Sequence, residues 1–443
     1  MIFVLRRKIT ENLMKWKANP KRHPLLVTGA RQVGKTYSIE DFAAKNYESY
    51  IYINFEKSPS LRKIFNGDLD METLIMNITA RFSETKIVPG KTLLVLDEIQ
   101  SCPNARTAMK SFSGDPRFDV IATGSLLGLN QSEVSLYPTG YEEYMEMYSL
   151  DFEEFLWALG IGADIISSVS TKLNLKEPLD PFILETFEGY FRQYMAVGGM
   201  PGVVDDFIVN KDFGRVRAIQ KNIIRSYEDD ISKYAKGVVR TRAKECLYSI
   251  PDQLGRRFRY NEVTGVHGAR RSMYDGGIEW LIGAGVVFKS YKITEPTPPL
   301  TYNRDMALFK LFLHDVGLLV CMMESDTVSM LLEGSPLVNW GKVAESAVAC
   351  EIVRKQIEPM YFEDKNLEVD FVTVIERDVV MTEVKSGNNK MSKSLDSVMS
   401  RKIGHIRGVK LERSNVITDH TGVEHYPLFA AAFIFPDDSG YKL

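Results

Sequence analysis

An eight-residue run near the beginning of the chain has the glycine and lysine spacing of a phosphate-binding loop. It reads Gly29-Ala30-Arg31-Gln32-Val33-Gly34-Lys35-Thr36 and matches the pattern G-x-x-x-x-G-K-[ST]. The glycines let the backbone wrap a phosphate, and the following helix, with Tyr37 in its first turn, adds a favourable dipole. We expect Lys35 to reach the β- and γ-phosphates of a nucleotide and the Thr36 hydroxyl to bind Mg²⁺.

Two acidic residues, Asp97 and Glu98, close the apolar run Leu93–Leu96, which is typical of a Walker B strand. We expect Asp97 to hold Mg²⁺ through its water shell and Glu98 to orient and deprotonate the attacking water. The next apolar run ends in Thr123-Gly124-Ser125, whose two hydroxyls would sense the γ-phosphate or position the water. Together these motifs predict ATP and Mg²⁺ as ligands.

A second group of chemically capable residues lies in the last third of the chain. Glu345 falls in an expected helix, Asp370 opens an expected strand, and Glu383 and Lys385 close the next strand. Residues two apart on a strand share one face, so Glu383 and Lys385 would point the same way. Asp370 and Glu383 would bind Mg²⁺, with Glu345 beside them and Lys385 activating water, as in a metal-dependent phosphodiesterase. The simpler interpretation is an ordinary exposed-strand pattern.

Two basic stretches are candidates for contact with nucleic-acid phosphates. Residues 385–413 carry eight basic residues against two acidic ones, and residues 256–260 interleave arginines with aromatic side chains. The alternatives are a solvated helix face for the first and packing against acidic surfaces for the second. DNA is the expected partner, although the pattern does not separate DNA from RNA.

The spacing of apolar residues predicts the elements that hold these groups. Between residues 25 and 155 short apolar runs alternate with mixed segments, which predicts β and α units around a parallel sheet. We expect strands at residues 24–28, 50–55, 92–96 and 118–122, and a helix at 38–44. Residues 151–235 have helical periodicity. Short helices and a strand pair at 286–293 then suggest a winged-helix-like region, and a helix at 342–358 with strands at 359–362, 369–375 and 379–384 follows.

These motifs resemble those of the AAA-type ATPases of bacteria and archaea that carry a conserved C-terminal domain of unknown function. Beyond the phosphate-binding motifs, the resemblance rests on 52–56, 96–100, Phe152-Glu153-Glu154-Phe155-Leu156, Gly198-Gly199-Met200-Pro201, Arg225–Ile231 and His314-Asp315-Val316-Gly317-Leu318. It implies an α/β chain with an AAA-type parallel sheet at 1–150, a helical lid at 151–239, a winged-helix-like region at 240–300 and a restriction-endonuclease-like domain at 301–443.

One position departs from the family pattern. An arginine often follows the glycine at the position of Gly140, whereas this chain has Tyr141. Such an arginine would neutralise charge on the transferred phosphoryl group. Arg106, Arg117 or a residue of a neighbouring subunit would have to replace it.

The composition fits an ordinary globular protein rather than a disordered or fibrous one. The chain has 443 residues with 44% hydrophobic residues and a net charge of −3, which excludes a whole-protein basic field. Four scattered cysteines and the lack of a long apolar segment favour the cytoplasm and no membrane. We expect a Mg²⁺-dependent ATPase coupled to a nucleic-acid-binding, nuclease-like C-terminal half, and the sequence leaves cleavage open. The alternative is a non-catalytic nucleotide switch that recruits a protein partner, and the pattern leaves homo-oligomerisation open.

Overall fold

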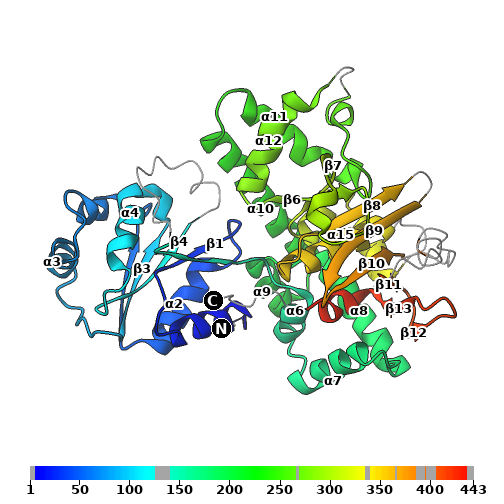
Figure 1. Ribbon diagram of the computed structural model, residues 1–443, viewed down its shortest axis with the longest axis horizontal. Helices are drawn as coiled ribbons and strands as arrows, with labels where there is room; N and C mark the ends of the chain where they lie inside the picture. Colours follow the sequence, from blue (N-terminus) through cyan, green and yellow to red (C-terminus); the bar gives the residue numbers. More distant parts are fainter. Residues whose placement is uncertain are drawn as a thin grey trace. The chain divides into compact units, whose positions relative to one another are not determined.

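The computed structural model describes residues 5–124, 140–265, 269–334, 340–364, 367–385, 395 and 406–436. The chain divides into two compact units (Figure 1). The P-loop unit comprises the described residues of Arg7–Tyr148 together with Gly283–Gly285. The larger unit comprises the described residues of Ser149–Ile282 and those from Val286 onward.

A five-stranded parallel sheet forms the centre of the P-loop unit, in the order β2-β3-β4-β1-β5. Its strands are β1 (Leu25–Thr28), β2 (Ser49–Asn54), β3 (Thr92–Asp97), β4 (Asp119–Thr123) and β5 (Glu143–Glu146). Strands β1, β3 and β4 are buried along their whole length, as expected for parallel strands covered on both faces. The four strands predicted from the sequence are confirmed. Strand β5, which is short and mostly polar, carried no such signal.

Short helices surround this sheet and place its functional loops. They are α1 (Ile9–Ala18), α2 (Lys35–Asn46), η1 (Pro59–Phe65), α3 (Met71–Arg81), η2 (Ile99–Ser101) and α4 (Pro103–Phe112). Helix α2 begins at Lys35, three residues before the expected start, because Gly34 adopts a left-handed conformation with φ 96° and turns the loop into the helix. The expected motif order of strand, loop and helix is therefore present.

Helices dominate the first part of the larger unit, as the periodicity predicted. They are α6 (Phe152–Ala158), α7 (Ala163–Asn174), α8 (Pro181–Val197), α9 (Pro201–Asn210), α10 (Phe213–Tyr234), α11 (Val238–Ser249), η3 (Pro251–Gln253), η4 (Tyr260–Glu262) and α12 (Arg271–Gly283). Aspartates start three of them, because Asp151, Asp180 and Asp212 each accept hydrogen bonds from backbone amides of the first turn. Asp151 also forms a capping box with Glu154.

An eight-stranded mixed sheet follows, in the order β12-β13-β11-β10-β9-β8-β6-β7. Its strands are β6 (Val287–Ile293), β7 (Arg304–Leu313), β8 (Met360–Asp364), β9 (Leu367–Ile375), β10 (Asp378–Val384), β11 (Ile406–Glu412), β12 (Ile417–Thr418) and β13 (Glu424–Pro427). The other elements of this part are η5 (Leu300–Asn303), α13 (Val316–Cys321), α14 (Thr327–Glu333), α15 (Trp340–Arg354), η6 (Leu428–Ala430) and α17 (Ala431–Ile434). Helix α15 packs against β7 and β10.

One expectation about this region is wrong, and another falls mostly outside the described residues. The strand pair expected within residues 286–293 is the single strand β6, which pairs antiparallel with β7 and parallel with β8. The strand that was to complete a separate winged helix is thus part of the C-terminal sheet. In the basic stretch 385–413 the expected helix face falls mostly outside the described residues, and the described residues Ile406–Glu412 form strand β11. Its residues Val409–Glu412 are buried, so strand packing and not charge determines its structure.

Among the helices that the structure describes, none combines the length and the apolar character needed to span a membrane.

Candidate functional site

The phosphate-binding loop lies between β1 and α2. Gly29 has φ 143°, and a Cβ atom there would come within 2.1 Å of the carbonyl oxygen of Met147. Glycine is therefore required at this position for both conformation and space. The ammonium of Lys35 donates hydrogen bonds to the carbonyl oxygens of Gly29 (2.9 Å) and Ala30 (2.8 Å), so the lysine lies over the loop that it belongs to.

Several charges act on Lys35. Burial lowers its pKa to about 8, Glu98 and Asp97 oppose that shift, and Arg31 adds to it. Lys35 thus stays mostly protonated at neutral pH. It lies close to both acidic residues of the Walker B motif and to a second cation of the loop, an arrangement suited to an anion with several charges.

The Asp97 carboxylate is the centre of the polar network next to the loop. It is 2% exposed and accepts hydrogen bonds from the hydroxyl of Thr36 (3.2 and 3.3 Å) and from the side-chain amide of Asn54 (2.8 Å). The hydroxyls of Tyr52 and Thr123 also donate to it. The structure thus brings the predicted Thr36, Asp97 and Thr123 together. The sequence argument assigned no role to Tyr52 and Asn54, although both lie at the end of a strand next to β3.

Glu98 follows Asp97 in a left-handed conformation with φ 56°. The side-chain amide of Gln100 donates a 2.6 Å hydrogen bond to its carboxylate. Burial raises the pKa of Glu98, and the Gln100 bond opposes the shift. A carboxyl with a raised pKa beside the P-loop lysine is suited to accept a proton. Gln100 was not predicted to act on Glu98, because sequence spacing does not show which way the turn after β3 folds.

A buried arginine supports the loop from the N-terminal side. The Arg7 guanidinium, 8% exposed, donates to the carbonyl oxygens of Val33 (2.9 Å) and Tyr148 (2.7 Å). It thus joins the P-loop to the chain segment that follows β5. This contact was not predicted, because residue spacing does not show which distant backbone carbonyl oxygens an arginine contacts.

The remaining predicted residues of this site are less informative. Tyr37 is 44% exposed in the first turn of α2, and Ser125 lies outside the described residues. Of the two arginine candidates, Arg106 is buried and pairs with Glu142 at 2.9 Å. Arg117 pairs with Asp115 at 2.8 Å and with Glu72 at 3.0 Å. Both are therefore held by carboxylates of this chain.

The residues at this site fit a magnesium ion. The Thr36 hydroxyl and the Asp97 carboxylate lie within hydrogen-bond distance of each other, and both are hard oxygen donors. Mg²⁺ typically takes one or two protein oxygens and completes its shell with water and phosphate oxygens, so this pair is sufficient.

The structure also brings together the acidic residues predicted in the C-terminal sheet, but around a lysine. The ammonium of Lys310, on β7, lies 2.9 Å from Glu345, 2.8 Å from Glu368 and 3.8 Å from Asp370. Asp370 also accepts the backbone N–H of Val384 (2.8 Å). Burial raises the pKa of Glu345 to about 7, and it raises that of Asp370.

The predicted pair Glu383 and Lys385 lies next to this group and forms its own ion pair of 2.7 Å. Burial raises the pKa of the Glu383 carboxyl, and Lys385 opposes that shift. In the ranges that the structure describes, no three histidine, cysteine or acidic side chains are arranged to hold a metal ion. The expected Mg²⁺ ligands Asp370 and Glu383 are bonded within the chain, Asp370 to the backbone N–H of Val384 and Glu383 to Lys385.

Several described residues of the two basic stretches form contacts within the chain. Arg407 forms a bidentate pair with Glu424, and Lys410 is 3% exposed on β11. In the second stretch Phe258 is buried and stacks on Phe309 with ring centroids 5.7 Å apart. Phe258 is thus a core residue, whereas Arg256 and Arg259 pair with the carboxylate of Glu262. Lys390, Lys393, Arg401 and Lys402 lie outside the described residues.

The later sequence signatures meet in a buried polar network that was not predicted. The Asp315 carboxylate is 0% exposed and accepts the backbone N–H of Gly199 (2.8 Å) and the hydroxyl of Ser149 (3.0 Å). The guanidinium of Arg354 lies 3.5 Å from Asp315 and donates to Ser149 (2.7 Å). Ser149 is the first residue after the P-loop unit, so the network fixes the point at which the chain enters the larger unit.

Glycines let these signatures pack closely. Gly198 has φ 74°, and a Cβ atom there would lie 2.1 Å from an Asp315 carboxylate oxygen. A Cβ on Gly199 would lie 2.0 Å from the carbonyl oxygen of Leu150. The motif Gly198-Gly199-Met200-Pro201 is therefore a packing motif, and Pro201 begins α9.

A buried histidine of this network predicts a pH dependence of stability. Burial lowers the pKa of His314 to about 4, and the hydroxyl of Tyr227 lies 3.0 Å from its ring. Below about pH 6.5 the unfolded chain binds a proton at this histidine, whereas the folded chain does so only near pH 4. The stabilisation that comes from the neutral ring is therefore complete only above about pH 6.5. It falls by about 3 kcal/mol as the pH falls from 6.5 to 4. Urea unfolding followed by circular dichroism should show this loss.

The matched comparison is His314→Gln against His420→Gln, because His420 is exposed. His314→Gln should be less stable than wild type at pH 7.5 but should lose less stability on acidification. His420→Gln should follow the wild type. Parallel acid profiles for His314→Gln and wild type would rule out the assignment.

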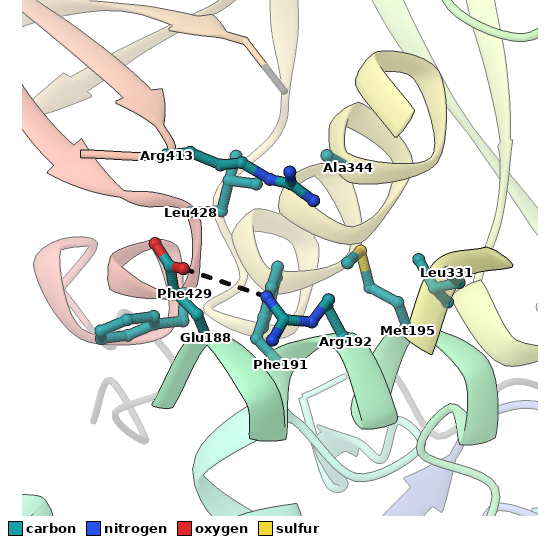
Figure 2. A pocket seen from close by; sticks show the side chains of 9 residues that line it. All are labelled: Glu188, Phe191, Arg192, Met195, Leu331, Ala344, Arg413, Leu428 and Phe429. Carbon is teal, nitrogen blue, oxygen red and sulfur yellow. Dashed lines mark ion pairs between the residues drawn. The ribbon is translucent and has the colours of Figure 1, made fainter. Parts of the chain in front are cut away.

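A small, partly open pocket lies elsewhere in the larger unit, and none of the predicted site residues lines it. Figure 2 shows Glu188 and Arg192 of α8 facing each other across its rim, with 3.9 Å between their charged groups. The Arg192 Nε atom has no hydrogen-bond partner among the described residues. The other residues that line the pocket are largely apolar and include Phe191, Met195 and Leu428. We assign no chemistry to this pocket.

Three segments of the chain match known protein families. Residues 21–156 match an AAA domain, residues 188–329 a domain of unknown function (DUF8612) and residues 340–428 another domain of unknown function (DUF4143). The fold and the site thus define a P-loop protein with an AAA domain. More particularly, the chain combines this domain with the two matched domains of unknown function.

The chain is also similar to an uncharacterized protein of Methanocaldococcus jannaschii. The two are 26% identical over 209 residues, which are 46% of this chain and 40% of that protein. The match therefore spans less than half of the curated relative.

Among solved structures, the chain is similar to the ORC1 protein of Aeropyrum pernix in complex with DNA, with a TM-score of 0.28 and 14% identity over 76% of this chain and 94% of that one. It is also similar to Cdc6p of Pyrobaculum aerophilum, with a TM-score of 0.26 and 13% identity over 73% of this chain and 92% of that one. TM-scores at this level carry no argument about function.

Proposed function

We propose that this protein is a Mg²⁺-dependent ATPase. The observation that carries the proposal is the cluster in the P-loop unit, where Lys35 lies over the glycine-flanked loop beside Asp97 and Glu98. The loop supplies backbone N–H groups for phosphate oxygens, and Lys35 supplies a positive charge. Bound Mg²⁺ would be held by Thr36 and Asp97 and would neutralise charge on the phosphates.

The chain's own residues divide the remaining chemistry. Glu98 orients the attacking water and accepts its proton, while Gln100 fixes the direction of the Glu98 carboxylate. Thr123 donates to Asp97 and receives the backbone N–H of Glu98 at 3.4 Å, so it links the two acids. We propose the hydroxyl of Ser125, which lies outside the described residues, as a second group that senses the γ-phosphate or positions the water. Because Arg106 and Arg117 are held in ion pairs, we assign the phosphoryl-neutralising arginine to a neighbouring subunit.

Replacing Glu98 by glutamine tests the ATPase proposal. The variant should bind ATP as the wild type does but lose about 10²- to 10⁴-fold in turnover, since glutamine cannot accept the proton. Steady-state phosphate release and equilibrium binding of a fluorescent ATP analogue measure the two effects separately. Glu84→Gln, at an exposed glutamate of the same unit, is the matched control and should behave as wild type.

The same assays decide between the enzyme and the non-catalytic alternative. If the wild type binds ATP but releases no phosphate under any condition, the protein is a nucleotide-dependent switch that recruits a partner. Turnover by Glu98→Gln at the wild-type rate would remove the base assignment. In either case we propose that nucleotide binding acts on the larger unit through the chain segment that Asp315 and Arg354 hold at Ser149. Equal protease-nicking patterns with ATP and ADP would contradict this coupling.

Nucleic-acid binding by the larger unit is the second candidate function. Residues 233–271 carry ten basic residues against three acidic ones, which makes this segment much more basic than the whole chain. Arg257 and Arg270 are exposed or partly exposed there. We propose that this segment, with the winged-helix-like order of α11 and α12, contacts the phosphate backbone of DNA or RNA. Salt-insensitive or absent binding of labelled DNA and RNA would contradict it.

The restriction-endonuclease-like character of the C-terminal sheet also stays a proposal. Its support is the order of the four predicted residues, with Glu345 on a helix, Asp370 on one strand and Glu383 and Lys385 at the end of the next. Cleavage is not part of the proposed function, because the described carboxylates do not form a metal site.

A further inference from the structure

A buried lysine occupies the middle of the C-terminal acidic cluster. Lys310 is 1% exposed, and its ammonium contacts three carboxylates from two elements, Glu345 of α15 and Glu368 and Asp370 of β9. The ring of Tyr361 lies below it, with 5.1 Å from the ammonium to the ring centre. No expectation from the sequence gave Lys310 a role.

The carboxylate oxygens that would bind a metal have other partners. Glu345 and Glu368 direct an oxygen each to Lys310 at 2.9 and 2.8 Å. One Asp370 oxygen accepts the N–H of Val384, and its other oxygen lies on the Lys310 side. The fourth acid of the cluster, Glu383, pairs with a second lysine, Lys385. A divalent ion with six or more oxygen ligands would have to compete with both ammonium groups.

Close packing holds this arrangement in place. The loop residue Gly255 has φ 63°, and a Cβ atom there would lie 2.7 Å from the second carboxylate oxygen of Glu345. On the sheet, Lys310 is paired in register with Ser290 of the adjacent strand β6. Both the lysine and its helix partner are thus fixed by backbone from neighbouring elements. Glu368 is 50% and Lys385 39% exposed, so solvent reaches the cluster from that side.

We propose that the ammonium of Lys310 is the permanent cation of this cluster and acts in place of a divalent metal ion. The site is therefore a metal-independent ion cluster that stabilises the C-terminal sheet, and it does not cleave nucleic acid. This inference does not depend on the nucleotide site, so either can fail without the other.

The electrostatics of the cluster agree with this role. Burial by itself would lower the pKa of Lys310, but the attraction of Glu345, Asp370 and Glu368 outweighs burial and raises it well above its usual value. An isolated buried ammonium would lose its proton, whereas this one keeps it. Burial raises the pKa of Glu345, and Lys310 opposes that shift.

Replacing the lysine by an uncharged residue of similar length tests the inference. In the full-length protein without nucleotide, Lys310→Met should unfold at a lower temperature than wild type at pH 7.5. Millimolar Mn²⁺ should raise its unfolding temperature by an amount on the order of 5 °C, because the carboxylates then accept a metal. Wild type and Lys310→Arg, which both keep a cation, should show no such gain. The double variant that combines Lys310→Met with Asp370→Asn should lose this gain in unfolding temperature.

Lys289→Met is the matched control. Lys289 lies on the adjacent strand, is 8% exposed on its side chain and pairs with the single carboxylate of Glu279. Mn²⁺ should change the unfolding temperature of Lys289→Met by no more than it changes that of wild type. Any weak Mn²⁺ binding at the P-loop affects all samples equally and therefore does not alter the comparison. A folded Lys310→Met protein that gains nothing from Mn²⁺ would overturn the inference.

The wild type provides a test even if Lys310→Met does not fold. Calorimetric titration with Mn²⁺ should give the same weak signal for wild type and Asp370→Asn. Incubation of wild type with Mg²⁺ and DNA or RNA should give no cleavage. Mn²⁺ binding that Asp370→Asn abolishes, or metal-dependent cleavage that Glu383→Ala and Lys385→Ala both abolish, would overturn the inference.

Discussion

Lys35→Ala should lose measurable binding of ATP while the protein keeps its fold. The ammonium would make at least two charge-assisted hydrogen bonds to phosphate oxygens, each worth about 1.5–3 kcal/mol, so affinity should fall roughly 100-fold or more. Equilibrium titration with a fluorescent ATP analogue measures the loss, and phosphate release should disappear with it. The variant loses the two hydrogen bonds from Lys35 to carbonyl oxygens of the loop, so we expect a loss of stability of about 1–3 kcal/mol, which leaves the protein folded.

Lys45→Ala separates this effect from a general loss of charge. Lys45 lies on the same helix α2 and pairs with Asp41 at 2.8 Å on the surface. Its variant should bind ATP as the wild type does, because surface ion pairs contribute little. If Lys35→Ala retains wild-type affinity, the loop is not the phosphate site.

Asp315→Ala should be the most destabilising single substitution in the larger unit that we predict. The variant removes one of the two acidic partners of the buried Arg354, which keeps Glu351, and it removes the acceptor for the backbone N–H groups of Gly199, Gly317 and Leu318. Breaking a buried pair in this way costs about 3–5 kcal/mol. Urea unfolding of the full-length protein measures the change.

Two comparisons make this prediction specific. Asp326→Ala removes an exposed aspartate that precedes α14 but makes no side-chain cap, and it should have little effect on stability. Asp315→Asn keeps one acceptor oxygen and should be less harmful than alanine. Stability of Asp315→Ala within the range of Asp326→Ala would mean that the network does not hold the signatures together.

The motifs of the P-loop unit could be predicted because each of them consists of adjacent residues. The loop from Gly29 to Thr36 and the acids Asp97 and Glu98 each depend on a few adjacent residues after an apolar strand, and parallel strands bring such ends to one edge. The contacts of Tyr52, Asn54 and Arg7 were missed for the opposite reason. They depend on which strands are neighbours and on backbone carbonyls, and neither has a signature in residue spacing.

The C-terminal acidic cluster shows the limit of pattern matching more clearly. The order of Glu345, Asp370, Glu383 and Lys385 predicted that these residues lie near one another, but it did not predict that the ammonium of Lys310 lies among the carboxylates. Lys310 lies on β7, earlier in the chain than all four, and an isolated lysine in an apolar strand gives no signal. Its presence changes the expected chemistry, because a metal site depends on where the carboxylate oxygens point and not only on which acids are near.

The later signatures illustrate a third case. The motif around Gly198 was expected to belong to the helical lid at 151–239, and the motif around Asp315 to the C-terminal domain at 301–443. In the structure their glycines and acid pack inside the larger unit, where a Cβ atom or a lost carboxylate would disrupt backbone contacts. Residue types alone do not separate a packing motif from a binding motif, since both use glycine and aspartate.

Isothermal titration of the wild-type protein with ATP and with GTP, in the presence of Mg²⁺, tests the central claim most directly. The arrangement of Lys35, Thr36 and Asp97 predicts saturable binding of a nucleoside triphosphate, with one site per chain and a loss of the signal in Lys35→Ala. The absence of binding heat for both nucleotides, with folded protein at several temperatures, would contradict the account.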